Sequence, residues 1–351
     1  MRTRVDSIQA LRAIAAIAVV FCHAQGHLAG FKIKYGIDDA WLNLIDPVRF
    51  GQCGVDIFFV ISGFIMALVT NGMHKRQGSI GDFVQKRLVR IFPPYWIWTS
   101  VFIFLIFFFP NLFSARTFEP IESILSLFLI PYSPSGYNTS PVLAVGWTLS
   151  YEIYFYVLVS IGLFFSRKKF VVGLGIFFLI TTAIFPQNHG PISNLTSNTI
   201  LFEFYSGVLL FELYKSGTRL PVILLICLSI LAMIAFYHFA ENGLSHLRFI
   251  YWGIPALAIV LSFIFLEKET DRRVPKILVF LGDTSYTLYL SHLVTLPGIG
   301  KVFVLTGLHK ILAPDVQIIL YTAACIVLGC VLYVTTEKPV LSYVRNKRAA
   351  Y

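Results

Sequence analysis

The stretch Leu11–Gly30 reads LRAIAAIAVVFCHAQGHLAG, an apolar run long enough to cross a membrane as a helix that nevertheless carries Arg12 and His23. The steps from Arg12 to His23, at about 100° each, return almost to the same helix face. The two residues lie about 16 Å apart along the axis, about half the thickness of a hydrocarbon core. Taken singly, Arg12 could be an interfacial anchor and His23 a packed core residue. Their alignment favours a functional wall, because ionisable groups at such depth usually serve function.

The composition places the whole chain among polytopic membrane proteins. Hydrophobic residues make up 57% of it and charged residues 13%, and the mean hydropathy is +0.75. The 28 Lys and Arg against 18 Asp and Glu could suggest nucleic acid as a partner. These cations stand at the ends of apolar segments, however, which indicates membrane orientation and argues against nucleic acid. The five cysteines form no close CxxC pair, so neither a disulfide framework nor a metal site is expected.

Length and hydropathy predict an all-α bundle of about ten membrane-spanning helices in a single domain, residues 1–351. The approximate limits are 9–29, 53–71, 91–110, 144–165, 170–186, 198–214, 221–239, 249–266, 277–297 and 316–336. If the N-terminus is cytoplasmic, 21 of the 28 Lys and Arg, Arg167 and Lys215 among them, fall on the cytoplasmic side and 7, Arg248 among them, outside. The positive-inside rule therefore predicts that both termini are cytoplasmic and that the connection near 111–143 faces outward.

With this topology, the outer half of the predicted bundle collects acids and imidazoles: His23, Asp56, Glu152, Glu203 and His292. A carboxylate beside a histidine strengthens it as a base and fixes its tautomer, which helps it to take a proton from a hydroxyl. We therefore expect His23 to be a general base, with Asp56 or Glu152 orienting it. The alternative for each acid is that it only pins two helices together through hydrogen bonds.

Two further sets of side chains are candidates for binding a substrate. Ser285, Tyr289 and His292 fall within a narrow arc of the ninth predicted helix, so they can form one polar stripe. Trp147 and Tyr151 lie near the predicted outer interface, where aromatic rings can stack on a sugar. The alternative for these two rings is ordinary packing.

The inner mouth of the predicted bundle collects cations. Arg12 is joined there by Arg87 and Arg90, whose i, i+3 spacing puts both on one helix face. Guanidinium groups bind phosphate oxygens in a bidentate manner, so these arginines are candidates to hold a phosphorylated ligand that enters from the cytoplasm. The alternative is that they only mark a cytoplasmic joint near anionic membrane lipid.

Six motifs follow one another in a fixed order over nearly the whole chain. They are Arg12 to His23, Gly54-Val-Asp-Ile-Phe-Phe-Val-Ile-Ser-Gly-Phe64, Arg87-Leu-Val-Arg-Ile-Phe-Pro-Pro-Tyr-Trp96, Trp147-Thr-Leu-Ser-Tyr-Glu152, Ser285-Tyr-Thr-Leu-Tyr-Leu-Ser-His292 and Glu337-Lys-Pro339. This order resembles the membrane-bound acyltransferase 3 family, and within it the exopolysaccharide-production O-acetyltransferases.

The resemblance implies an integral enzyme of a bacterial inner membrane with no permanently bound cofactor. It implies transfer of an acetyl or other short acyl group from an acyl-CoA, such as acetyl-CoA, to a hydroxyl of a carbohydrate or lipid-linked glycan. The three inner arginines would then hold the CoA phosphates and His23 would deprotonate the acceptor, with Tyr151 or Tyr289 stabilising the oxyanion. An acyl-histidine intermediate is the alternative mechanism. The alternative function is a proton-coupled transporter of a lipid or glycan, and a purely structural scaffold is the third reading.

Overall fold

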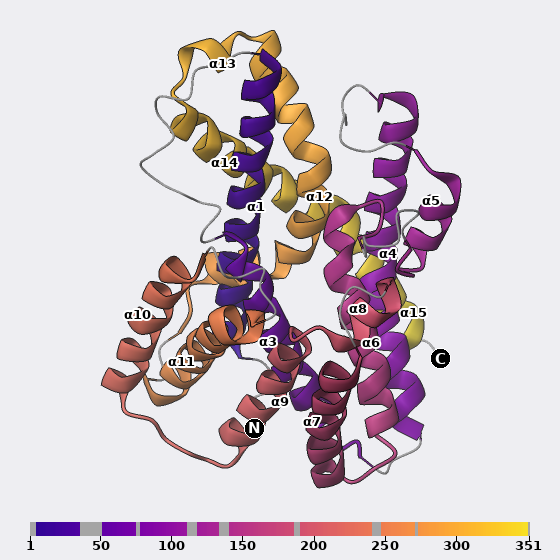
Figure 1. Ribbon diagram of the computed structural model, residues 1–351, viewed down its shortest axis with the longest axis vertical. Helices are drawn as coiled ribbons and strands as arrows, with labels where there is room; N and C mark the ends of the chain where they lie inside the picture. Colours follow the sequence, from indigo (N-terminus) through magenta and orange to yellow (C-terminus); the bar gives the residue numbers. More distant parts are fainter. Residues whose placement is uncertain are drawn as a thin grey trace.

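The computed structural model describes residues 5–35, 51–74, 78–110, 118–132, 140–185, 190–240, 247–270 and 273–349. These residues form helices and no strand, which confirms the all-α prediction (Figure 1). In chain order, the helices are α1 Asp6–Tyr35, α3 Cys53–Val69, α4 Gly78–Phe108, α5 Pro120–Leu127, η2 Ala144–Gly146, α6 Trp147–Gly162, α7 Arg167–Ile184, α8 Pro191–Ser197, α9 Leu201–Lys215, α10 Val222–His238, η4 Phe249–Gly253, α11 Ile254–Thr270, α12 Lys276–Leu305, α13 Leu308–Ile311, α14 Pro314–Leu332, η5 Tyr333–Glu337 and α15 Lys338–Ala349.

Each of the ten segments predicted to cross the membrane coincides with helical structure, but the count of ten crossings is not confirmed. In the described part of the chain, six helical segments are long and apolar enough to span a bilayer, and α3 and α10 are shorter apolar helices. The remaining two predicted spans correspond to α7 and α9. α7 opens on three cations, Arg167 to Lys169, and α9 has only 15 residues. About 20 apolar residues are needed for a full crossing, so these two fall short.

Two of the helices that extend beyond their predicted limits, α4 and α12, continue through prolines. α4 begins at Gly78 and runs through Pro93 and Pro94, although its span was predicted to start at 91. Arg87 and Arg90 therefore lie within a continuous helix rather than in a joint. α12 likewise continues through Pro297. Prolines inside membrane helices are tolerated where neighbouring helices satisfy the freed backbone groups.

The N-terminal helix lies at the centre of one half of the fold. α1 packs chiefly against α12 and also contacts α3 and α14, as Figure 1 shows. A Cβ added to Gly282 of α12 would lie 2.1 Å from the carbonyl oxygen of Gln9, so only glycine permits this approach of the two backbones. The close approach of α1 to α12 sets the spacing of the side chains farther along both helices.

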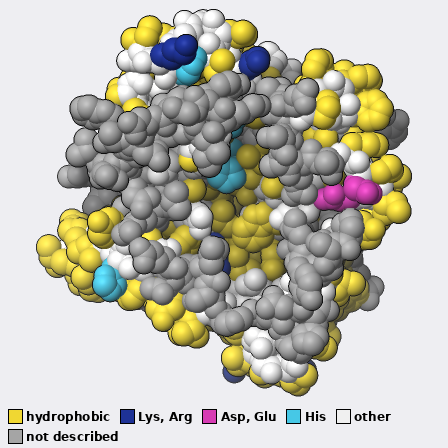
Figure 2. Space-filling model, turned by 45° about the horizontal axis from the view of Figure 1, so that its top comes forward, with side chains coloured by type: hydrophobic (Ala, Val, Ile, Leu, Met, Phe, Trp, Pro, Cys, Tyr) yellow, Lys and Arg dark blue, Asp and Glu magenta, His cyan; other side chains and the backbone are white. Residues whose placement is uncertain are grey.

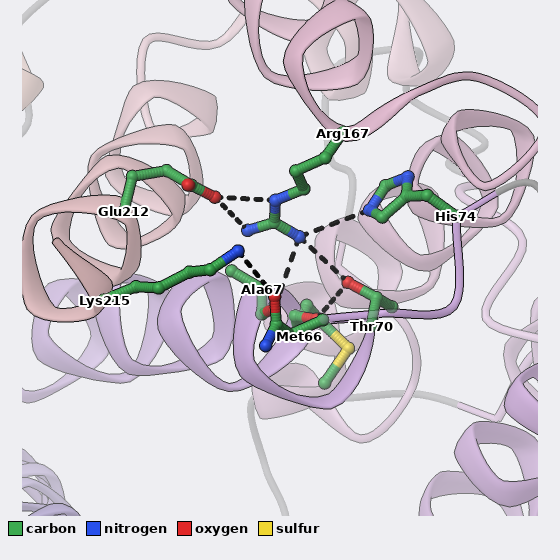
Figure 3. A network of polar contacts seen from close by, with 8 residues as sticks. Met66, Ala67, Thr70, His74, Arg167, Glu212 and Lys215 are labelled. Carbon is green, nitrogen blue, oxygen red and sulfur yellow. Dashed lines mark hydrogen bonds and ion pairs between the residues drawn. The ribbon is translucent and has the colours of Figure 1, made fainter. Parts of the chain in front are cut away.

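Polar contacts fix the C-terminal end of α3. Arg167, at the start of α7, donates from Nε to Glu212 Oε1 at 2.6 Å. Its Nη1 lies 3.3 Å from Ala67 O, Thr70 Oγ1 and His74 Nε2 (Figure 3). One guanidinium therefore joins α3, α7, α9 and the turn that follows α3.

The other end of α3 carries Asp56, which is fully buried and forms a bidentate ion pair with Arg248. Arg248 belongs to the cations predicted to lie outside, whereas Arg167 and Lys215 at the opposite end of α3 belong to those predicted inside. Lys215 reaches the turn after α3, where its Nζ is 3.0 Å from Asn71 Oδ1. Residues predicted to share a membrane side thus share an end of α3; which side is cytoplasmic stays a prediction.

Candidate active site

A cavity of about 760 Å³, part of it open to solvent, lies between α1, α3, α4, α6 and α12. Its walls include six of the side chains predicted to form a site, which are Arg12, Arg87, Arg90, Glu152, Ser285 and Tyr289. The structure therefore brings together residues from four helices that are far apart in sequence.

A hollow floored by hydrophobic side chains opens on the face drawn in Figure 2. A histidine lies at its upper edge in this view, and a lysine or arginine side chain is visible at its lower edge. Apolar walls with a few polar groups are typical of a small-molecule site.

Arg87 supplies hydrogen-bond donors that the described protein does not use. Its Nε and Nη1 are buried and have no hydrogen-bond partner among the described residues. Its guanidinium carbon lies 5.8 Å from the centroid of the Phe83 ring, and Tyr156 interacts with the same group. A guanidinium with unused donors in a cavity wall is suited to binding an anion.

Arg12, also in the wall, is 9% exposed. The carboxylate of Glu337 interacts with Arg12 electrostatically and accepts a hydrogen bond from Thr287 Oγ1. Glu337 is thus held in place from α12, near the arginines.

Glu152 also lies at the arginine end of the site. Its Oε1 accepts a hydrogen bond from Tyr156 Oη, one helical turn on, and lies 3.4 Å from Ser62 Oγ. Tyr156 was not among the predicted residues, although its i, i+4 spacing from Glu152 on a helix could have revealed it. Glu152 is therefore a wall residue of the cavity, bonded to α3 and to its own helix.

The Asp56 carboxylate forms an ion pair with Arg248 and does not line the cavity. Arg248 donates from Nε and Nη2 to its two carboxylate oxygens, each at 2.9 Å, and stacks on the Trp252 ring at 4.9 Å. Glu203 interacts with the same pair and is fully buried. Sequence reasoning missed Arg248 because it stands outside the predicted spans and far from Asp56 along the chain.

His23 has a partner other than the two predicted carboxylates. Among the described residues, its Nδ1 lies 3.1 Å from Nε2 of His292, and the two ring centroids are 4.9 Å apart at 62°. The prediction that Asp56 or Glu152 lies against His23 is therefore corrected: the described side chain that contacts His23 is the imidazole of His292. The physical reason is that depth along a helix was predictable, whereas the facing direction of each acid was not.

Tyr289 connects the cavity with the histidine pair. It lines the cavity, and its ring centroid lies 6.0 Å from that of His292, one turn away on α12. Its hydroxyl lies 3.0 Å from Thr148 Oγ1 and 3.2 Å from Val145 O, at the start of α6. Tyr289 therefore belongs to the same cavity wall as the three arginines and lies beside His292.

The remaining predicted binding residues have structural contacts. Ser285 lines the cavity but donates its hydroxyl to Gly282 O at 2.7 Å. Trp147 and Tyr151 pack edge to face at 5.8 Å, and both contact the Phe59 ring. The Tyr151 hydroxyl donates to a backbone carbonyl of α8. Neither ring lines the cavity. Their contacts therefore fit ordinary packing, the alternative to stacking on a sugar.

Comparison with known proteins agrees with the motif order. A family profile described as an acyltransferase domain matches residues 5–334. The exopolysaccharide production protein ExoZ of Rhizobium meliloti is 32% identical over 306 residues, which cover 85% of this chain and 92% of that protein.

Two more distant relatives extend the comparison. The peptidoglycan O-acetyltransferase OatA of Listeria monocytogenes is 24% identical over 83% of this chain and 49% of its own length. Nodulation protein 10 of Rhizobium leguminosarum is 27% identical over 58% of this chain and 59% of its own. No solved structure gives a significant match. Since the family profile covers nearly the whole chain and the residues named above as lining the cavity lie within it, this integral membrane protein belongs to the acyltransferase 3 family and is an O-acyltransferase.

Proposed function

We propose that the protein transfers an acetyl or other short acyl group from acyl-CoA to a hydroxyl of an exopolysaccharide or another cell-surface glycan. One observation carries the proposal: a cavity lined by three arginines, one with unused donors, reaches Tyr289 beside a pair of histidines. Relatives named for exopolysaccharide production and for peptidoglycan O-acetylation support a glycan as the acceptor.

The arginine end of the cavity fits the phosphates of the donor. Guanidinium forks match phosphate oxygens, and Arg87 has two donors to offer without breaking a bond to a described residue. The predicted charge distribution puts this end on the cytoplasmic side of an inner membrane, where acyl-CoA is found. The flexible arm of the donor would then run between α3 and α12 toward Tyr289.

The histidine end supplies the base. His23 takes the proton of the acceptor hydroxyl as its oxygen forms a bond to the thioester carbonyl carbon. The carbon–sulfur bond then breaks, the acyl group stays on the acceptor, and the proton passes from His23 to the leaving sulfur to give CoA thiol. Tyr289 is our candidate to donate to the oxyanion, for which its hydroxyl must turn away from α6. An acyl-histidine intermediate would instead leave labelled acetyl on the protein when no acceptor is present.

Donor binding tests the arginine end. Replacing Arg87 and Arg90 together with Ala should weaken binding of acetyl-CoA by about tenfold or more, with a smaller effect on an acetyl thioester that lacks the nucleotide. The matched control replaces Lys168 and Lys169, two exposed cations of α7 that are absent from the cavity wall. Equal losses for both donors, or for both double variants, would contradict a phosphate site at these arginines.

Transfer itself tests the histidine end and separates the enzyme from a transporter. The variant His23→Ala should insert into the membrane and bind acetyl-CoA, yet lose transfer by about 10²-fold or more. The readout is the O-acetyl content of surface glycan in a deletion strain that carries each variant. Normal acetylation with the His23→Ala variant would refute this base. Unchanged acetylation on deletion, with glycan retained inside the cell, would favour transport.

A further inference from the structure

The histidine pair determines which ring nitrogen of His23 is available. His292 lies on α12, is fully buried, and has its Nδ1 3.2 Å from the carbonyl oxygen of Leu288, one turn back. A carbonyl oxygen can only accept a hydrogen bond, so the proton of this contact belongs to Nδ1 of His292. A neutral imidazole carries one N–H, and its other nitrogen, Nε2, therefore presents a lone pair.

The same reasoning determines which nitrogen of His23 carries the proton. Its Nδ1 faces that lone pair at 3.1 Å, so the proton between the two rings must come from His23. His23 is then protonated on Nδ1, and its Nε2 carries a free lone pair. No described residue forms a hydrogen bond with His23 Nε2 that would occupy it.

The opposite arrangement requires a charged ring. His292 could donate to His23 only if both of its nitrogens were protonated, and His23 would then be protonated on Nε2 and unable to act as a base there. The surroundings of the pair disfavour that cation. His292 is fully buried, and Leu288 and Leu296, one turn before and after it on α12, belong to an apolar cluster with Ala16, Val20 and Ala24 of α1. An uncompensated charge in such a place is costly.

We propose that His292 is a positioning residue that holds His23 in the tautomer whose Nε2 accepts the proton of the acceptor hydroxyl. This inference rests on the proposed function and names the atom that performs it. His292 touches neither substrate in this scheme; it acts through its hydrogen bond to His23. The orientation of a base by a second group is a recurring arrangement in acid–base catalysis.

Two substitutions of His292 distinguish its role as a hydrogen-bond acceptor from a role in filling space. His292→Gln retains an acceptor oxygen, whereas His292→Leu fills the site without one. We expect the Leu variant to lose about 10- to 100-fold in transfer rate at unchanged affinity for acetyl-CoA, since a misplaced catalytic group costs up to about 10²-fold. The Gln variant should recover most of that loss. The matched control is Ser291→Ala, which removes a buried neighbouring hydroxyl with no partner among the described residues.

A spectroscopic measurement reports the tautomer in the wild-type protein, apart from any loss of activity in the His292 variants. In the wild-type protein, ¹⁵N-histidine NMR should show His23 protonated at Nδ1 and not at Nε2, with the signal assigned by its absence in His23→Gln. A His23 ring protonated at Nε2 would overturn the proposal, and so would full transfer by His292→Leu or equal losses in the Leu and Gln variants. Because His23→Ala tests the base itself, loss of transfer there together with normal transfer by His292→Leu would reject this inference and keep the proposed function.

Discussion

Replacing Gly282 with Ala should separate the two histidines without touching either. The added Cβ would lie 2.1 Å from Gln9 O, and atoms at such separations must move to at least about 3.0 Å. α12 and α1 would therefore separate by about 1 Å. If α12 moves as a rigid body, the 3.1 Å contact between His292 and His23 lengthens to about 4 Å, which no longer makes a hydrogen bond. A shift of about 1 Å can cost about 10²-fold in rate, so we expect a loss of that order.

The same substitution elsewhere on α12 provides the control. Gly298 has no atom within 4 Å of an added Cβ, so Gly298→Ala should transfer acyl groups at the wild-type rate. Alanine favours a helix over glycine by about 1 kcal/mol, which helps both variants to stay folded. The assay is glycan O-acetyl content, normalised to the amount of monodisperse protein in the membrane. Equal activity of the Gly282 and Gly298 variants would refute the idea that this close approach sets the histidine contact.

Three other perturbations probe separate parts of the molecule. Asp56→Asn should lower the unfolding temperature rather than donor affinity, because it leaves Arg248 without its buried carboxylate, and breaking such a pair costs about 3–5 kcal/mol; an unchanged melting curve would contradict this. Arg12→Ala should raise the acetyl-CoA concentration needed for half-maximal transfer by about tenfold while the maximal rate changes little, and the opposite split would place Arg12 in the chemical step. Burial and the neighbouring Arg167 lower the pKa of His74 below its ordinary 6.5, so the unfolded chain binds a proton first as the pH falls. The His74 contribution to stability is therefore present above about pH 6.5 and is lost on acidification; His74→Gln should flatten the acid side of the stability curve, and an unaltered pH dependence would exclude this role.

The sequence was sufficient to predict where the helices lie and how far apart polar side chains stand along one helix. Hydropathy located the helices, and the predicted topology grouped Arg12 with Arg87 and Arg90, which now line one cavity wall. His23 and His292 were assigned one depth, and the structure brings them into contact. These results follow because rise per residue and side-chain periodicity are fixed by the helix itself.

Partner choice was harder to predict, because it depends on how helices are rotated and where the connections lead. Asp56 was predicted to share the outer half with His23, yet its carboxylate pairs with Arg248. Glu152 bonds to Tyr156 and lines the arginine end of the cavity instead of approaching His23. No spacing rule in a single sequence determines which of several acids at one depth turns toward a given ring.

The Asp56–Arg248 ion pair has a consequence for the synthesis of the protein. Its two members are 192 residues apart, so the carboxylate emerges from the ribosome long before its cation. At about 5–20 residues per second, the delay is about 10 to 40 s. During that interval α3 cannot settle with its charged first turn in hydrocarbon. We expect it to wait near the lipid headgroups or beside the insertion machinery until residue 248 has been made, so this part of the bundle is completed late and out of chain order.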